Sequence, residues 1–320
     1  MTVGGRGGDR WERPGEHPTA EAEITSWTTV EGRSVAVFAQ YPTGGGPLLP
    51  VVLLCHGLGG GHRGYAGLGA HLASHGYAVL HPQFLDAAAL AVPGGTPGSD
   101  ERSWKSDPAL RAAMLALLFD PAHWLSRVER ARAVLDTLTS QRHVPGLDPD
   151  GVVVAGHSFG AYTAQLLLGT RLYGVGMDGR CFRHPAVAGG VLLSPQGSGD
   201  RGLTDRSWDG VELPLLEITA TRDLGPHGEG LAWRREVFDA AASRRKYLAV
   251  VRGGDHFLGG IPVADRYSHD EEGAEVRTAV AALATAFADE VRGDDLAGEW
   301  LAGSPFSHLV DHERSGVRSS

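Results

Sequence analysis

The sequence GHSFG at residues 156–160 places a serine between two glycines at the spacing of a nucleophile turn. A β-prone run, Val152–Ala155, leads into it, and a helix-forming run, Ala161–Leu168, follows it. In such a strand–turn–helix setting the serine hydroxyl is exposed above the sheet at the N-terminus of a helix, and the glycines leave room for the sharp turn. We therefore predict that Ser158 is a nucleophile. The alternatives are a glycine-rich turn without chemistry, or Cys55 as the nucleophile, although Cys55 lies inside an apolar run.

A serine hydroxyl is a poor nucleophile and needs an adjacent base. Residues 247–256 read YLAVVRGGDH, which indicates a strand and a Gly-Gly turn that lead to His256. We predict that His256 is the base, because the base comes last where the chain order is serine, acid, histidine. The later histidines do not directly follow a predicted strand: His269, His308 and His312. An exposed loop histidine is the alternative interpretation of His256.

A third residue has to orient the imidazole and stabilise its positive charge. Residues 214–223 read PLLEITATRD, so Asp223 lies just past one predicted strand and ahead of the last one. We predict that Asp223 is this acid, with a turn aspartate that caps the next segment as the alternative. Four other carboxylates compete for the role: Asp200, Asp205, Asp209 and Asp255.

Acyl transfer places negative charge on the substrate carbonyl oxygen, which two backbone N–H groups normally bind. One donor is the residue after the nucleophile, here Phe159, and the other comes from the loop after an earlier strand. Residues 51–61 read VVLLCHGLGGG, which makes Leu58 the candidate second donor, with a plain tight turn as the alternative. The same glycine run lacks the Lys and Ser/Thr of a phosphate-binding loop. We predict that Gln83, Trp104 and Phe257 line the substrate pocket.

Strands and helices alternate along the rest of the chain. The predicted strands are Ile24–Val30, Ser34–Gln40, Val51–Cys55, Tyr77–His81, Val152–Ala155, Val187–Leu193, Leu215–Thr219 and Tyr247–Val251. The predicted helices are Tyr65–Ser74, Leu125–Leu138, Ala161–Leu168, Leu231–Ala242 and Ala274–Val291. The alternation favours parallel pairing, because parallel neighbours need crossover connections. We therefore predict an α/β protein with a mostly parallel sheet of about eight strands, helices on both faces and an antiparallel hairpin at one edge.

The predicted domain spans residues 21–302, between a disordered N-terminal tail at residues 1–20 and a C-terminal tail at residues 303–320. Residues 85–119 interrupt the alternation. A connection this long is usually functional, and it leaves the C-terminal end of a central strand, where open sheets bind ligands. We predict that residues 85–119 form a cap or a wall of the pocket.

Composition and charge argue against several partners and locations for the protein. The formal net charge is −9, which argues against binding to nucleic acid or anionic lipid. No apolar run reaches the length of a membrane span, and the first residues do not resemble a secretory signal. Cys55 and Cys181 are expected to be reduced thiols in a cytoplasmic protein. Neither a metal ion nor an organic cofactor is expected, since the predicted side chains suffice for acyl transfer.

The sequence resembles a bacterial group of dienelactone-hydrolase-like proteins, near the platelet-activating-factor acetylhydrolases, chlorophyllases and cutinase-type polyester hydrolases. The matching stretches are VVLLCHGLGGGHRGYAGLGAHLASHGYAVLHPQ, DERSW, GHSFGAYTAQ, PLLEITATRD and VVRGGDHF, within Val51–Ala302. The resemblance implies the α/β-hydrolase fold. It also implies that Ser158, Asp223 and His256 form a catalytic triad and that the N–H groups of Leu58 and Phe159 form the oxyanion hole.

The sequence departs from these families in two ways. Dienelactone hydrolases proper use a cysteine nucleophile, where this chain has Ser158. In the acetylhydrolases the acid follows an earlier strand, and the corresponding stretch here, VLLSPQG, has Ser194 and no carboxylate. The position of Asp223 matches the polyester hydrolases instead. The resemblance implies cleavage of a small carboxylic ester through an acyl-serine. Acyl transfer or thioester cleavage with the same triad, and a non-catalytic binding protein, are the alternatives.

Overall fold

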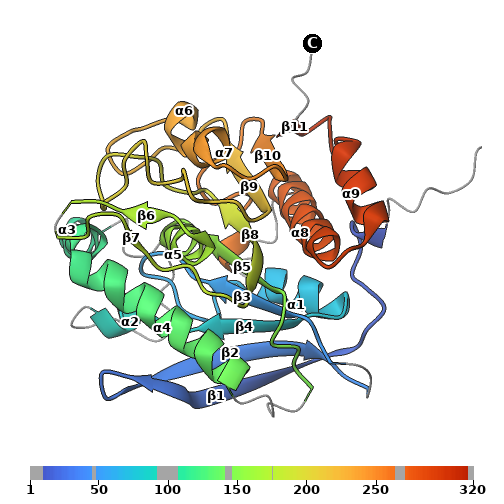
Figure 1. Ribbon diagram of the computed structural model, residues 1–320. Coiled ribbons are helices and arrows are strands. Elements are labelled where there is room, and N and C mark those ends of the chain that lie inside the picture. Colours follow the sequence, from blue (N-terminus) through green and yellow to red (C-terminus); the bar gives the residue numbers. More distant parts are fainter. Residues whose placement is uncertain are drawn as a thin grey trace, which may run out of the picture.

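A nine-stranded sheet forms the centre of the protein (Figure 1). The computed structural model describes residues 10–44, 48–91, 107–140, 146–174, 176–263 and 271–315. The strand order is β1-β2-β4-β3-β5-β8-β9-β10-β11. The strands are β1 (Thr19–Val30), β2 (Arg33–Pro42), β3 (Val51–Cys55), β4 (Ala78–Pro82), β5 (Val152–His157), β8 (Val187–Leu193), β9 (Leu215–Ala220), β10 (Lys246–Val251) and β11 (Val310–Arg314). A separate two-stranded sheet pairs β6 (Arg171–Leu172) with β7 (Arg180–Cys181).

The strands from β4 to β10 are parallel, as the alternation of strands and helices predicts. At one edge, β2 is antiparallel to both β4 and β1, and at the other edge β11 is antiparallel to β10. The hairpin of β1 and β2 turns at Glu31 and Gly32, which both have positive φ. This confirms the predicted hairpin. The carboxyl ends of the parallel strands all lie at one edge of the sheet, so residues that follow them are brought together.

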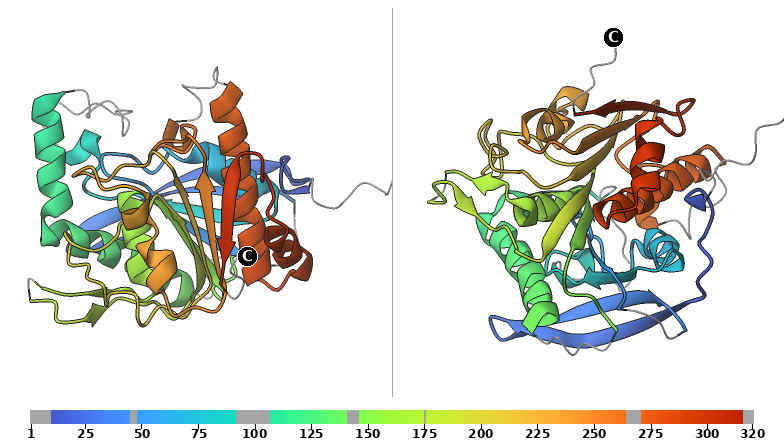
Figure 2. Two further views of the ribbon diagram at one scale, coloured as in Figure 1. Left: turned by 90° about the horizontal axis from the view of Figure 1, so that it is seen from above. Right: turned by 45° about the vertical axis from the view of Figure 1, so that its right-hand side comes forward.

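The parallel strands are buried on both faces, which explains their continuous apolar sequences. In β3, Val51, Leu53 and Cys55 belong to one core cluster, whereas Val52 and Leu54 belong to another. This alternation follows from the two-residue period of a strand. Helices α4 (Pro121–Ser140) and α5 (Phe159–Leu168) contribute to the first cluster, and α1 (Ala66–Ser74) and α8 (Glu271–Val291) to the second. Figures 1 and 2 show these helix pairs on opposite sides of the sheet.

The other helices are short and belong to the connections. They are α2 (Ala88–Ala91), α3 (Pro108–Phe119), α6 (Leu231–Arg234), α7 (Glu236–Ala240), the 3-10 turn Ile261–Val263 and α9 (Asp295–Ala302). The segment predicted to be helical near Leu231–Ala242 is helical but divided into two short helices, because Arg235 ends α6 and precedes α7. Among the described residues, no helix is both long and apolar enough to cross a membrane.

Both predicted tails are wrong in the parts that the structure describes. Trp11 is only 2% exposed, packs against Trp300 at 4.9 Å between ring centroids, and donates a hydrogen bond of 2.8 Å to Asp289. The polar and glycine-rich composition of the first 20 residues conceals this buried side chain. The predicted C-terminal tail contains β11, which is the last strand in the order of the nine-stranded sheet. Its sequence VDHER lacks an apolar run because edge strands are often short and charged.

The predicted insertion at residues 85–119 contains two helices in its described part, α2 and α3. Asp107 begins α3, because its carboxylate accepts hydrogen bonds from the N–H groups of Ala109 and Leu110 and Pro108 occupies the first helical position. Residues 92–106, including Trp104, lie outside the described part of the chain.

Candidate active site

The GHSFG sequence forms a sharp turn between β5 and α5. Ser158 has φ 55° and ψ −121°, a conformation that is strained for a residue with a side chain. A Cβ atom on Gly156 would lie 2.3 Å from the carbonyl carbon of Gly160, and one on Gly160 would lie 2.0 Å from the carbonyl oxygen of Cys55. Both glycines are therefore required by close backbone contacts, and the turn exposes the hydroxyl of Ser158 at the N-terminus of α5.

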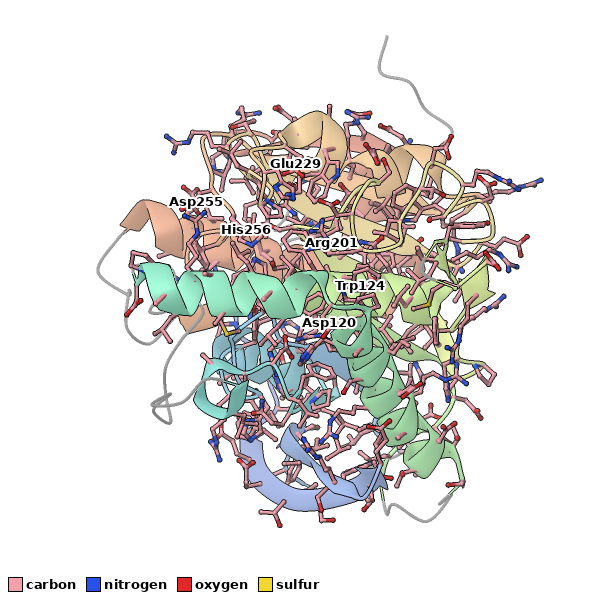
Figure 3. All side chains as sticks on the ribbon, turned by 90° about the vertical axis from the view of Figure 1, so that its left-hand side faces the viewer. Asp120, Trp124, Arg201, Glu229, Asp255 and His256 are labelled. Carbon is pink, nitrogen blue, oxygen red and sulfur yellow. The ribbon has the colours of Figure 1, made fainter. Side chains whose placement is uncertain are left out.

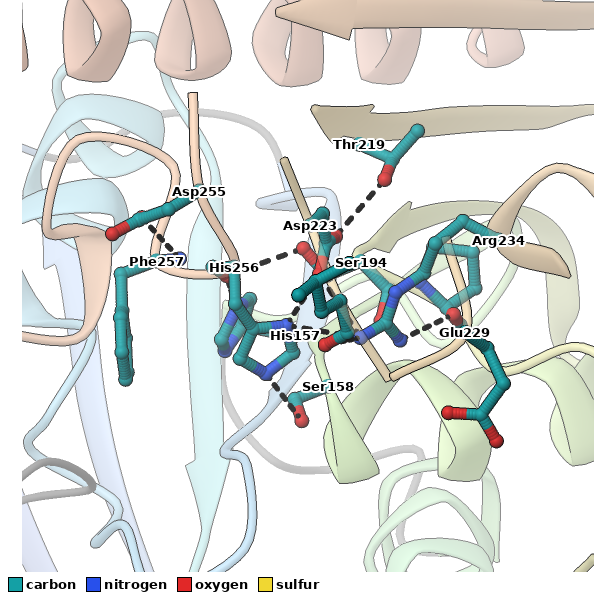
Figure 4. A network of polar contacts seen from close by, with 12 residues as sticks. His157, Ser158, Ser194, Thr219, Asp223, Glu229, Arg234, Asp255, His256 and Phe257 are labelled. Atoms are coloured by element: carbon teal, nitrogen blue, oxygen red, sulfur yellow. Dashed lines mark hydrogen bonds and ion pairs between the residues drawn. The ribbon is translucent and has the colours of Figure 1, made fainter. Parts of the chain in front are cut away.

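Three side chains from different strand ends meet at this turn (Figure 4). His256 Nε2 lies 3.0 Å from Ser158 Oγ, and His256 Nδ1 lies 2.8 Å from Asp223 Oδ1. Ser158 follows β5, Asp223 follows β9 and His256 follows β10. Thr219, in β9, donates a hydrogen bond of 2.9 Å to Asp223 Oδ2. The structure thus brings together the serine, histidine and carboxylate that the sequence singles out, each within hydrogen-bonding distance of the next.

Asp223 also forms a buried ion pair that sequence reasoning missed. Arg234 Nη2 lies 2.9 Å from Asp223 Oδ1, and the two side chains are only 2% and 0% exposed. Arg234 further donates to the carbonyl oxygens of Ser194, Pro195 and Leu224. Burial raises the pKa of Asp223, but the adjacent His256 and Arg234 and a hydrogen bond from Ser194 outweigh it and lower that pKa below its usual value. The carboxylate is therefore ionised.

The environment of His256 keeps its imidazole neutral. Burial lowers its pKa to about 4, although the neighbouring Asp223 favours the charged form. Electrostatic interactions with Arg234 and His157 lower this pKa further. At neutral pH the ring can therefore accept a proton at Nε2, the nitrogen that faces Ser158.

Two backbone N–H groups near Ser158 are unpaired among the residues that the structure describes. Neither the Leu58 N–H nor the Phe159 N–H has a protein acceptor in the described part of the chain, whereas the neighbours Gly57 and Gly59 donate to Tyr65 Oη and to the carbonyl oxygen of Asp86. Phe159 is the first residue of α5, where a helix leaves its N–H groups unpaired. Leu58 and Ser158 line one cavity. Both N–H groups are therefore available to a ligand, as binding of an oxyanion would require.

A buried cation supports the loop that contains Leu58. Arg127 and Asp86 form an ion pair of 2.6 Å in which both side chains are almost fully buried. The same guanidinium donates to the carbonyl oxygen of His56 and to Thr163 Oγ1 in α5. The pair thereby fixes the loop after β3 against the helix that follows the nucleophile. No local pattern in the sequence indicates this contact, because the sequence around Arg127 is typical of a residue on the exposed face of a helix.

A second network joins the two sides of the site. His157 Nε2 lies 2.7 Å from the carbonyl oxygen of His256, and His157 Nδ1 lies 2.8 Å from Tyr65 Oη. A carbonyl oxygen can only accept, so the neutral ring carries its proton on Nε2 and Nδ1 accepts from Tyr65. Tyr65 in turn accepts from the Gly57 N–H. The turn, the loop of the histidine and the loop of Leu58 are therefore connected.

A cavity of about 230 Å³ opens beside Ser158 and His256. Its lining residues are Leu58, Arg111, Leu115, Leu118, Ser158, Gln196, Arg201, Leu224, Gly225, Pro226, Arg234 and His256. Three of them belong to α3, which agrees with the prediction that residues 85–119 contribute a wall of the pocket. The cavity is smaller than the usual ligand cleft of about 300–1,000 Å³.

Neither Gln83 nor Phe257 is among the described residues that line this cavity. Gln83 accepts a hydrogen bond from the His62 N–H and donates to the carbonyl oxygen of Phe84, so it stabilises the loop beside the site instead. Phe257 packs edge-on against His256, with 5.6 Å between ring centroids. Trp104 lies outside the described residues.

The competing site residues lie elsewhere or have other partners. The carboxylate of Asp255 accepts from the Phe257 N–H and not from His256. Cys55 is buried in β3, where burial raises its thiol pKa to about 12. His308 pairs with Glu275, and His312 donates to the carbonyl oxygen of Pro305. Asp205 and Asp209 are exposed, and His269 lies outside the described residues.

One group of described side chains has the composition of a metal site. Asp200, His227 and Glu229 each offer a ligand atom, and these atoms lie within 4.8 Å of one another. Asp200 and His227 are exposed and form an ion pair of 2.8 Å. The three residues lie outside the cavity lining, so the arrangement around Ser158 does not include them.

Comparison with known proteins agrees with this architecture. Residues 52–314 match the model of the alpha/beta hydrolase family. The matched range covers most of the chain and includes the three side chains that meet at the turn. No curated protein matches the sequence significantly. The parallel sheet with helices on both faces and the extent of the match show that the chain belongs to the alpha/beta hydrolase family.

Proposed function

We propose that the protein hydrolyses a carboxylic ester through an acyl-serine intermediate. The observation that carries this proposal is the position of His256, whose Nε2 is 3.0 Å from Ser158 Oγ and whose Nδ1 is 2.8 Å from Asp223 Oδ1. These distances suit a nucleophile, a general base and a residue that orients the base. Membership of a family of hydrolases supports the reaction class.

The first half of the reaction forms the acyl-serine. His256 Nε2 accepts the proton of Ser158 as Oγ attacks the ester carbonyl carbon, and the carbonyl oxygen becomes an oxyanion that the N–H groups of Leu58 and Phe159 bind. His256 then returns the proton to the leaving alcohol as the C–O bond breaks. Asp223 stabilises the imidazolium between these steps and remains ionised.

The second half releases the acid. Water replaces the alcohol, His256 Nε2 accepts a proton from it, and the hydroxide attacks the acyl carbon. The oxyanion forms again on the same two donors. When the bond to Ser158 Oγ breaks, His256 protonates Oγ, so the enzyme returns to its starting state and the products are one acid and one alcohol.

The narrower family likeness also supports ester cleavage. A serine in the turn and an acid after β9 agree with the polyester-hydrolase pattern better than with dienelactone hydrolases proper or the acetylhydrolases. Acyl transfer and thioester cleavage would use the same side chains. Hydrolysis is the reaction we propose because water alone completes it.

Labelling with a fluorophosphonate probe tests the nucleophile directly. We expect one adduct, located on Ser158 by peptide mass spectrometry, together with turnover of p-nitrophenyl acetate. Ser158→Ala should abolish labelling and lower turnover by several orders of magnitude while the protein remains folded. The exposed Ser26→Ala variant is the control and should behave as the parent.

The outcomes separate the candidate functions. A folded protein that neither labels nor turns over ester would be a binding protein on this fold, and activity retained in Ser158→Ala would remove Ser158 from the mechanism. Added alcohol distinguishes hydrolysis from transfer. If a new ester replaces most of the free acid as the product, the protein is an acyltransferase.

A further inference from the structure

Basic side chains line the cavity beside Ser158. Three arginines contribute to it, Arg111, Arg201 and Arg234, and none of the described lining residues is an Asp or a Glu. The chain as a whole has the opposite balance, with a formal net charge of −9. The positive character of the cavity is therefore local, and it favours a ligand with negative charge.

Arg201 is the buried member of this set whose side chain forms no ion pair in the described part of the chain, although the charges of Asp200 and Glu229 are near enough to favour its protonated form. The residue is 2% exposed, yet its Nε and Nη1 atoms are buried without a hydrogen-bond partner in the described part of the chain. Its guanidinium lies 5.5 Å from the ring centroids of both Phe119 and Trp233, which hold it in position. Most buried polar atoms in proteins are paired, because a buried donor without a partner has lost its hydrogen bonds to water.

Arg111 is exposed to solvent, whereas Arg234 and the two carboxylates near Arg201 have partners within the protein. Arg234 pairs with Asp223, so its charge is balanced within the protein. Asp200 pairs with His227, and Glu229 accepts a hydrogen bond from the His227 N–H. Neither carboxylate forms an ion pair with Arg201 in the described chain. Burial lowers the pKa of Arg201 to about 10, so the group remains protonated at neutral pH.

We propose that the ester substrate carries a carboxylate group, separate from the bond that is cleaved, which the guanidinium of Arg201 binds. This inference rests on the proposed ester hydrolysis and specifies its substrate class. Nε and Nη1 are separate donors of a charged guanidinium, and each can donate a charge-assisted hydrogen bond to a carboxylate oxygen. In Figure 3, Arg201 and His256 lie beside α3, and both line the same cavity.

The remaining walls suit the rest of such a substrate. Leu58, Leu115, Leu118 and Leu224 are apolar and line the same space. They would contact the carbon chain between the carboxylate and the ester. An apolar surrounding also strengthens a charged hydrogen bond, because water screens it less. The volume of about 230 Å³ limits the substrate to a short chain.

Paired substrates that differ only in the charged group test the proposal. The p-nitrophenyl monoester of adipic acid is compared with p-nitrophenyl hexanoate, which places the charge on the acyl side. The acetate ester of 4-hydroxybenzoate is compared with that of methyl 4-hydroxybenzoate, which places it on the alcohol side. For at least one pair, we expect kcat/KM to be about 10- to 100-fold higher for the carboxylate, the range expected of a charged hydrogen bond.

Variants of Arg201 show whether this residue is the cause. Arg201→Met should reduce the preference to less than about 3-fold, mainly by lowering kcat/KM for the carboxylate substrate, whereas Arg201→Lys should retain part of it because the charge remains. Both replacements share the positive φ of 62°, so backbone strain is the same in each. The control is Arg206→Met, an exposed arginine in the same connection, which should leave the preference unchanged.

The results distinguish this inference from the proposed function. If the fluorophosphonate labels Ser158 but the parent uses neutral and charged esters equally, the inference is overturned and ester hydrolysis stands. An equal loss on both members of a pair in Arg201→Met would also overturn it, since that indicates a structural role. If Ser158 does not label, calorimetric titration of adipate into the parent and into Arg201→Met tests the carboxylate site by itself. Binding of adipate that is at least about 10-fold weaker in Arg201→Met supports the site, and equal Kd values overturn it.

Discussion

Arg234 and His256 share a single oxygen atom of Asp223. The Nη2 atom of Arg234 lies 2.9 Å from Oδ1, and the Nδ1 atom of His256 lies 2.8 Å from the same atom. Because the other oxygen accepts from Thr219, both oxygens of the carboxylate are occupied. The acid is therefore held by a buried cation as well as by the imidazole, and Arg234 is a positioning residue for the proposed catalytic triad.

Replacement of Arg234 by methionine should change both pH dependence and stability. Arg234 lowers the pKa of His256, so its removal should move the acidic limb of the kcat/KM profile to higher pH. The variant also leaves a buried carboxylate and three carbonyl oxygens without this donor, which should lower the free energy of unfolding by about 3–5 kcal/mol. Rate profiles and urea unfolding measure the two effects. The control is Arg235→Met, at a neighbouring and more exposed residue, for which we expect the free energy of unfolding to change by about 1 kcal/mol. If the acidic limb does not move in Arg234→Met, Arg234 is not a positioning residue.

The pH profile of the parent protein should reveal the depressed pKa of the base. Since burial lowers the pKa of His256 from 6.5 to about 4, kcat/KM should rise with an apparent pKa well below 6.5 and should be constant at neutral pH. An inflection near 6.5 to 7 would contradict this environment for His256. The measurement requires intact protein at each pH, which circular dichroism checks.

The same shift predicts a loss of stability in acid. Between pH 6.5 and about 4, the unfolded chain binds a proton on His256 that the folded protein does not bind. The free energy of unfolding contributed by this group is therefore fully present above pH 6.5 and falls as the pH decreases toward 4. Urea unfolding at a series of pH values measures this dependence. A His256→Gln variant should show a smaller decrease over the same interval, and an identical decrease would assign it to other groups.

Asp223 and Asp255 follow two neighbouring strands, so replacing each of them gives a matched test of which carboxylate acts on His256. Asp223→Asn should lower kcat by about 10⁴-fold, because the amide no longer stabilises the imidazolium and disturbs its tautomer. Asp255→Asn, next to His256 in sequence, should change kcat only a few fold at most, since the carboxylate of Asp255 contacts the Phe257 N–H. Steady-state kinetics of both variants measure this, and a reversed ranking would make Asp255 the acid.

A methyl group at Gly160 should disrupt the nucleophile turn. The added Cβ would lie 2.0 Å from the carbonyl oxygen of Cys55 and 2.8 Å from that of His56, so either β3 or α5 must move. We expect Gly160→Ala to lower activity at least about 100-fold, because a misplacement of about 1 Å has that effect on a reacting geometry. Gly230→Ala, which has open space and no positive φ, should retain activity. Equal activities would show that the close contact does not position Ser158.

The strands and the three reacting side chains could be predicted because each depends on a local signal. The apolar runs of β3, β5, β8, β9 and β10 are continuous, since parallel strands are buried on both faces. Ser158, Asp223 and His256 each follow such a run, and the carboxyl ends of parallel strands meet at one edge of the sheet. Their position therefore follows from the topology.

The supporting cations could not be predicted in this way. Arg127, Arg201 and Arg234 are buried, yet in sequence an arginine in a helix or loop has the composition of a solvated surface. Their partners lie 41 residues away for Arg127 and 11 for Arg234, so only the folded chain reveals the contacts. Trp11 and β11 were missed for a related reason, because tertiary packing and strand pairing determine them and local composition does not.

The hydrogen bonds through Tyr65 and His157 connect the loop of His256 to the backbone of Gly57, next to Leu58. Tyr65 precedes α1, 92 residues before His157, and His157 contacts the carbonyl oxygen of His256, which is 99 residues further along the chain. A displacement at the start of α1 therefore shifts the imidazole and the Gly57–Leu58 backbone together. Sequence changes in α1 can consequently alter the rate of the proposed reaction without touching the substrate. When α1 moves, the His256 imidazole and the Leu58 N–H keep their positions relative to each other.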